Sequence, residues 1–231
     1  MTAEQKLFPR AMSLAVHELR TPVTVVAGYL RMLLREQGGP LTEKQRKMLE
    51  EAERSCNRIG ALVAEMSELG KLEGGDLAFA RQEFDFAALL AELASAMHEG
   101  EDRGVRLVVR GIDRPVLVIG DRARLSAAVK ALMHSVLRER GEPGVIVAQC
   151  SVHTDATPEW AIVAIGDESL IPSLSAASGA DGHTFDEWRG GLGMALPVAR
   201  RVIESHGGRI WSLDGSHSRA ASAFRIPLRT T

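Results

Sequence analysis

The chain has 231 residues, 45% hydrophobic and 25% charged, and its formal net charge of −2 gives no electrostatic reason to expect nucleic-acid binding. Its two cysteines, Cys56 and Cys150, are too few for a disulfide framework and match no metal-ligand spacing, which indicates reduced thiols in the cytoplasm. No apolar run reaches the roughly 18 residues of a membrane-spanning helix, so no membrane segment is expected.

The first 70 residues have the apolar spacing of two α-helices. In the first helix the apolar residues recur at intervals of four and three, and they are Met12, Val16, Leu19, Val23, Val26, Leu30 and Leu33. Gly38, Gly39 and Pro40 should end this helix, since Gly accepts left-handed geometry and Pro removes a backbone donor. Thr42 and Gln45 form a capping-box pattern that begins a second helix. The apolar stripe of that helix is Met48, Ala52, Ser55, Ile59, Leu62, Met66 and Leu69.

The two helices are expected to form an antiparallel hairpin, which alone would leave apolar surface in water. Pairing two copies into a four-helix bundle covers that surface, so a homodimer is predicted. The alternative is that the second half of the chain covers the hairpin within one monomer. The Gly-rich residues 70–76 mark a change in composition and a candidate hinge.

After the linker, the pattern changes to a mixture of helices and strands. Helices are expected over residues 86–97, 122–138 and 193–205. Runs rich in β-branched residues predict strands over residues 105–109, 116–119, 145–152, 160–165, 209–213 and 223–228. Residues 173–189 are rich in small side chains and predict a mobile loop. Together these elements are typical of an α+β fold with helices on one face of a mixed sheet.

The motif HELRTP at residues 17–22 lies inside the first helix. Because Leu19 belongs to the apolar stripe, His17 is expected on its flank, turned toward solvent or a partner. A neutral imidazole is a good nucleophile for a phosphoryl group near pH 7, and Glu18 can accept its ring proton. Thr21 stands one turn from His17 and could orient water for hydrolysis of a partner's phosphoaspartate. The proline of the motif should kink or loosen this turn.

HELRTP resembles the H-box of sensor histidine kinases, and the hairpin around it resembles their dimerization and histidine-phosphotransfer domain. The resemblance implies that His17 is the phosphorylated residue and Glu18 the assisting base. It also implies that Glu18 and Thr21 form the phosphatase pair. The expected organisation is a phosphotransfer hairpin over residues 1–72, a linker over 73–83 and a catalytic domain over 84–231.

Residues 84–231 resemble the catalytic domain of these kinases, an α+β sandwich of the Bergerat or GHKL type. Asp121 opens a helix as in the family's N-box, and the sequence HGGRI at residues 206–210 is typical of the fold. Gly191 and Gly193 match the second glycine box, where backbone N–H groups approach a phosphate. The resemblance therefore implies ATP and Mg²⁺ as cofactors.

The departures from the family fall on the positions that bind the cofactors. Ser135 occupies the position of the Asn that holds Mg²⁺ and is a candidate cofactor-binding residue, although its shorter side chain should hold the ion more weakly. No dedicated metal ligand is expected in this chain. Arg138 keeps a positive charge near the phosphates, and Asp167 keeps the carboxylate that accepts from the adenine amino group. The first glycine box, D-x-G-x-G-I in the family, reads DESLIP at residues 167–172 and lacks both glycines. If either position needs positive φ, the loop must rearrange.

Three functions are therefore considered. The first is an ATP-dependent protein histidine kinase that passes phosphate from His17 to an aspartate of a response-regulator receiver domain. The second is a histidine phosphotransferase or phosphatase with a vestigial catalytic domain that binds ATP weakly or not at all. The third is a non-catalytic dimeric adaptor that docks response regulators, and the intact H-box makes it the least favoured.

Overall fold

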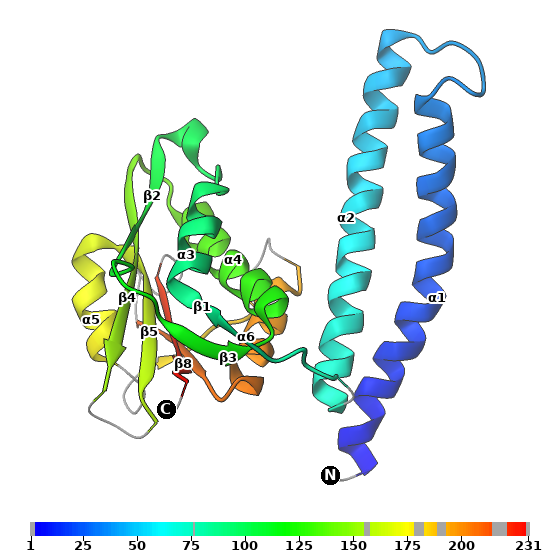
Figure 1. The fold of residues 1–231 in the computed structure, drawn as a ribbon. Helices are drawn as coiled ribbons and strands as arrows, with labels where there is room; N and C mark the ends of the chain where they lie inside the picture. The colour runs from blue at the N-terminus through cyan, green and yellow to red at the C-terminus, as the bar shows by residue number, and fades with distance from the viewer. Residues whose placement is uncertain are drawn as a thin grey trace. The chain divides into compact units, whose positions relative to one another are not determined.

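The computed structural model describes residues 3–75, 77–154, 158–177, 183–188, 193–213 and 221–229. The chain divides into two compact units, residues 1–77 and 78–231. A helical hairpin forms the first and an α+β sheet domain forms the second (Figure 1), which confirms the expected fold class. Among the described helices, none has the length and apolar character needed to cross a membrane.

Two 32-residue helices, α1 (Ala3–Leu34) and α2 (Glu43–Gly74), lie side by side and antiparallel in the first unit. The capping box is confirmed, because Gln45 N donates to Thr42 Oγ1 at 3.3 Å and Thr42 N donates to Gln45 Oε1 at 2.9 Å. α2 continues into the expected hinge as far as Gly74 and is capped by Gly75, whose φ of 72° is the left-handed geometry that favours glycine.

The buried seam of the hairpin only partly matches the predicted apolar stripes. Val16, Ala27, Cys56 and Val63 are buried between the helices, and the Cys56 thiol donates to the Val23 carbonyl at 3.6 Å. A single hairpin was expected to leave apolar surface in water, and it does, because each stripe is wider than one helix–helix seam. Large apolar side chains that stay exposed are Leu14, Leu19, Val25, Val26, Tyr29, Met32, Leu33, Met48 and Ile59.

A six-stranded sheet forms the centre of the second unit. In spatial order its strands are β2 (Val105–Arg110), β4 (Gly144–His153), β5 (Trp160–Asp167), β8 (Ser222–Pro227), β7 (Arg209–Ser212) and β6 (His183–Thr184). β2 and β4 are parallel, and the other neighbouring pairs are antiparallel. The strands β1 (Gln82–Asp85) and β3 (Leu117–Gly120) form a separate antiparallel pair.

Helices cover both faces of this sheet (Figure 1). One face carries α3 (Phe86–Ser95), α4 (Arg122–Glu139) and α6 (Ala195–Ser205), whereas α5 (Ile171–Ala176) lies on the other. Short 3₁₀ turns occur at η1 (Glu101–Arg103) and η2 (Glu168–Leu170).

Neighbouring residues of the strands point to opposite faces and form two cores. On the first face Phe224 packs edge-on against Phe86 of α3, with ring centroids 6.2 Å apart. On the second face Ala164 and Trp211 cluster with Leu174 of α5. The sequence predicted the first layer of helices but not α5, β1 or β6.

Candidate functional site

His17 lies on the exposed side of α1, with 79% of its side chain accessible. The residue before it, Val16, is only 4% exposed, and this anchor turns the following side chain outward. Glu18 Oε1 lies 3.2 Å from His17 Nδ1, and Thr21 is also exposed. When Nδ1 donates its proton to Glu18, the Nε2 lone pair faces outward as a nucleophile. The structure therefore places His17 and Glu18 together at the surface.

The helix that carries His17 is not interrupted by its proline. α1 is helical from Ala3 to Leu34, so Pro22 lies within it and does not end it. Pro22 supplies no N–H to the carbonyl one turn before it. Two residues later the Thr24 hydroxyl donates to the Arg20 carbonyl at 2.8 Å. The expectation of a loosened turn at His17 stays a prediction.

In the second unit, Asp167 ends β5 and is held by a guanidinium of the same chain. Its Oδ1 forms an ion pair with Arg140 Nη1. Arg140 also donates from Nε to the Glu142 carbonyl at 3.1 Å and from Nη2 to the Pro143 carbonyl at 3.5 Å. The side chains of Asp167 and Arg140 are 33% and 20% exposed. The carboxylate expected to accept from adenine thus already accepts from Arg140.

The residues after Asp167 are helical rather than a glycine loop. Ser169 lies in η2, and Ile171 begins α5 with φ −56° and ψ −46°, so both have right-handed geometry. Ile171 is 4% exposed and Leu174 is fully buried. Trp211 Nε1 donates to the Leu174 carbonyl at 2.9 Å. The expected mobile loop was therefore wrong for residues 173–177, because α5 buries apolar side chains against the sheet.

The N-box position Ser135 is 1% exposed on α4, and its Oγ has no hydrogen-bond partner among the described residues. Its neighbour His134 pairs with Glu99, with Nδ1 and Oε2 3.4 Å apart. Arg138 is exposed near the end of the helix. The described part of the chain contains no group of His, Cys, Asp and Glu side chains suited to a metal ion.

Of the second glycine box, Gly193 is described and Gly191 lies outside the described residues. Gly193 has φ 64°, a conformation that favours glycine, and it stands two residues before α6. This geometry explains a glycine at this position, and its approach to a phosphate stays a prediction.

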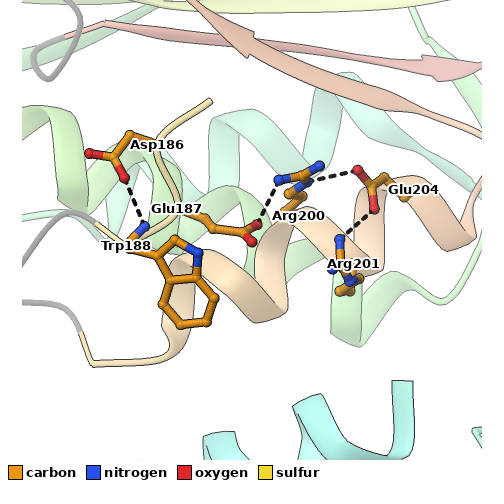
Figure 2. A network of polar contacts seen from close by, with 6 residues as sticks. All are labelled: Asp186, Glu187, Trp188, Arg200, Arg201 and Glu204. Atoms are coloured by element: carbon orange, nitrogen blue, oxygen red, sulfur yellow. Dashed lines mark hydrogen bonds and ion pairs between the residues drawn. The ribbon is translucent and has the colours of Figure 1, made fainter. Parts of the chain in front are cut away.

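A polar network holds residues 185–188 against α6 (Figure 2). Glu187 is 7% exposed, and its Oε2 lies 3.2 Å from Arg200 Nη1, while Arg200 Nε donates to Glu204 at 2.8 Å. The hydrogen bond to Glu204 raises the pKa of Arg200 above its ordinary value. Phe185 beside this network is 3% exposed, and Trp188 is 66% exposed. No sequence pattern indicates this network, because Glu187 lies outside the helices and strands and is 13 residues from Arg200.

Asp121 and His206 form a second polar centre that sequence reasoning treated only as family landmarks. The Asp121 backbone N–H donates to His206 Nε2 at 2.9 Å, and His206 Nδ1 lies 2.7 Å from the Val202 carbonyl. Asp121 Oδ2 accepts from the Ala80 N–H at 3.1 Å, and the Phe79 ring packs edge-on against His206. This centre fixes the segment that enters the second unit.

Burial and hydrogen bonds shift both pKa values in this centre. Burial lowers the pKa of His206 below its ordinary value, and the cation of Arg81 acts in the same direction. Burial opposes ionisation of Asp121, but backbone hydrogen bonds from Arg124 and Ala80 outweigh it and lower the pKa of that carboxyl. The neutral imidazole and the ionised carboxylate are therefore the forms that the fold stabilises.

The described residues do not fit ATP and Mg²⁺ in the manner that the resemblance implied. Asp167, the expected adenine acceptor, pairs with Arg140, and the residues expected to form the first glycine box form η2 and the start of α5. At the expected magnesium position, Ser135 presents a short and fully buried hydroxyl.

Residues 10–75 match the His Kinase A (phospho-acceptor) domain family, and this range contains the HELRTP motif. The chain is 30% identical over 226 residues to the sensor protein GacS of Pseudomonas syringae pv. syringae, covering 91% of this chain and 24% of that protein. It is 29% identical over 203 residues to the signal transduction histidine-protein kinase BarA of Escherichia coli (strain K12), covering 84% and 22%. The chain thus spans about a quarter of the length of these curated relatives.

Two solved structures share the fold. Full-length ShkA in complex with AMPPNP superposes with a TM-score of 0.74 at 18% identity, over 97% of this chain and 47% of that chain. The histidine kinase AdeS of Acinetobacter baumannii superposes with a TM-score of 0.57 at 21% identity, over 93% and 98%. Both structures are similar to this chain in the arrangement of their helices and strands.

Proposed function

Because this chain is a relative of the sensor histidine kinases and carries their His Kinase A domain, we propose that His17 carries a phosphoryl group in two-component signalling. The observation that supports this best is the geometry at His17: an imidazole 79% exposed on a helix, with a carboxylate 3.2 Å from Nδ1. Such a ring is open to a second protein, and its outward nitrogen is free to react when Nδ1 holds the proton.

The proposed reaction is a reversible transfer between His17 and the aspartate of a receiver domain. In the forward direction Nε2 attacks the phosphorus of an aspartyl phosphate, the N–P bond forms, and the aspartate carboxylate leaves. Glu18 stabilises the positive ring that results, by holding the proton on Nδ1. In the reverse direction the aspartate oxygen attacks phosphohistidine. Thr21, one turn away, is proposed to orient water for hydrolysis of the aspartyl phosphate.

We further propose that two copies of the hairpin form a four-helix bundle. Apolar side chains such as Val26 and Ile59 are 50% and 47% exposed in one chain, and covering such residues is worth about 1.5–3 kcal/mol for each side chain fully buried.

Cys56 and Cys150 are free and buried, which suits the reducing cytoplasm.

Two phosphoryl donors are considered for His17. The kinase relatives, and the AMPPNP bound to the ShkA structure, favour ATP and hence an autokinase. The Arg140–Asp167 pair favours the second function, in which His17 receives phosphate from a receiver and the catalytic domain is vestigial. In both cases the phosphoryl group resides on His17.

Radiolabelling separates these functions. The full chain is incubated either with a panel of ³²P-phosphorylated receiver domains or with γ-³²P-labelled ATP and Mg²⁺. We expect acid-labile label on wild type from a receiver and no label on His17→Gln. The matched control is His98→Gln, because His98 is also exposed, at 73%, with Glu101 Oε1 3.0 Å from its Nδ1. Label that persists on His17→Gln, or no label from either donor, would contradict the proposal, and the latter result would leave the adaptor.

A further inference from the structure

We infer that Arg140 forms an ion pair with Asp167 and thereby prevents adenine nucleotides from binding to the second unit. His17 takes no part in the described contacts around Asp167, so the effect of Arg140 can be tested by nucleotide binding alone.

The Arg140 guanidinium is held in place on three sides. Its Nε donates to the Glu142 carbonyl, its Nη2 donates to the Pro143 carbonyl, and its Nη1 pairs with Asp167. A guanidinium is planar and presents its donors in a fixed fork. Because the Glu142 and Pro143 carbonyls hold Nε and Nη2, the remaining nitrogen, Nη1, points toward the Asp167 carboxylate.

The loop also has the space that this arrangement needs. A Cβ on Gly144 would lie 2.4 Å from Arg140 Nη2 and 3.0 Å from Cζ. The absence of a side chain at Gly144 thus lets the guanidinium lie across the start of β4. Because Ile146 of β4 pairs with Asp167 of β5, this position is next to the carboxylate.

The chain after Asp167 packs against the other face of the sheet. In the family the two glycines of this box let the backbone pass close to the base. Here Ile171 and Leu174 are buried on the far face of the sheet, and the Trp211 indole donates to the Leu174 carbonyl. Residues 171–174 are therefore held against the sheet.

The Arg140 guanidinium and the amino group of adenine would compete for Asp167, and the guanidinium forms the stronger bond. The Arg140 pair joins two charges and is partly buried, and such charge-assisted hydrogen bonds are stronger than neutral ones. The amino group of adenine is a neutral donor, so it would replace a stronger bond with a weaker one. Arg140 would also have to leave two backbone acceptors. We therefore expect adenine nucleotide to lose this competition at millimolar concentration.

The test is titration calorimetry of the full chain with ATP and Mg²⁺, and with ADP alone. Wild type is expected to show no binding up to 1 mM, about the upper end of ordinary substrate affinities. Arg140→Ala should gain affinity by at least about tenfold, and the double variant Arg140→Ala/Asp167→Asn should lose that gain. Arg110→Ala is the matched control, since it removes the guanidinium whose Nη1 lies 2.6 Å from Glu168 Oε1 beside the site. It should behave as wild type.

Two results would overturn the inference. One is micromolar binding by wild type. The other is no binding by either Arg140→Ala or Arg140→Gln while both keep the wild-type circular dichroism and melting temperature, which would place the block elsewhere. Repeating the titration on the His17→Gln background separates this result from the labelling experiment, because His17 has no part in the contact.

Discussion

At the scale of single residues, His17 and Glu18 are neighbours in the sequence, and their side chains interact although neither is buried. Both side chains are mostly exposed, so their contact adds little to stability. Its effect is on the ring, because a carboxylate at Nδ1 selects the tautomer that leaves Nε2 as the nucleophile. Glu18 is therefore expected to matter for the rate of transfer and not for folding.

Replacing Glu18 with Gln should slow phosphoryl transfer from a receiver to His17 at least about 100-fold, the lower end of the usual contribution of one acid–base group. The melting temperature should stay that of wild type. Rapid-quench measurement of phosphohistidine gives the rate. Glu101→Gln, which changes the carboxylate beside His98, is the control and should keep the wild-type rate. An unchanged rate in Glu18→Gln would remove Glu18 from the mechanism.

His206 should make stability depend on pH. Its folded pKa lies below the unfolded value of about 6.5, so its stabilising effect is complete above pH 6.5 and is lost as pH falls toward the folded pKa. The slope from one group is at most about 1.4 kcal/mol per pH unit. Urea unfolding at pH 7.5 and 5.5 should show a larger loss for wild type than for His206→Gln. His98→Gln, at an exposed site, should lose as much free energy of unfolding between pH 7.5 and 5.5 as wild type does. If His206→Gln also loses as much as wild type, His206 is not the group responsible.

At the scale of elements, α5 shows how a short helix can form without a strong signal of its own. It has six residues, fewer than an isolated helix needs, and so depends on its contacts with the sheet. Leu174 supplies much of that contact, because it is fully buried in the cluster with Ala164 and Trp211. The helix should therefore be sensitive to the size of this side chain.

Leu174→Ala is expected to lower the free energy of unfolding by about 2–4 kcal/mol, the range for a large-to-small change in a packed core. Chemical denaturation of the full chain measures it. The control is Ser173→Ala, an exposed change on the same helix, which should cost less than about 0.5 kcal/mol. Similar values for the two variants would mean that α5 does not pack as described.

At the scale of the whole molecule, the exposed apolar side of the hairpin predicts its assembly. Ile59 and Asn57 are both exposed on α2, two residues and roughly 200° apart around the helix. Only Ile59 belongs to the apolar stripe, so only a charge at Ile59 would be buried in a bundle. The two positions thus form a matched pair for testing the homodimer.

Ile59→Glu should weaken the dimer at least about 100-fold, since a buried unpaired carboxylate is costly. Sedimentation velocity should then show a species near the chain mass of 25.0 kDa. Asn57→Glu should sediment as wild type. If wild type itself is a monomer at micromolar concentration, the predicted four-helix bundle is wrong.

The sequence by itself determined the features that depend on near neighbours. The capping box at Thr42, the long helices, most strands and the HELRTP motif follow from spacings of one to four residues, where side chains meet through the local geometry of the backbone. Family resemblance added the second unit's fold, which the sheet order and the solved structures bear out.

Only the tertiary structure decided the contacts between distant residues. Arg140 and Asp167 are 27 residues apart, and Asp121 and His206 are 85 apart, so no local pattern indicates either pair. The same holds for the face of α2 that meets α1 at Cys56 and Val63, since a wide stripe leaves several seams open. The physical reason is that spacing fixes which side of an element is apolar, whereas packing fixes which partner meets it.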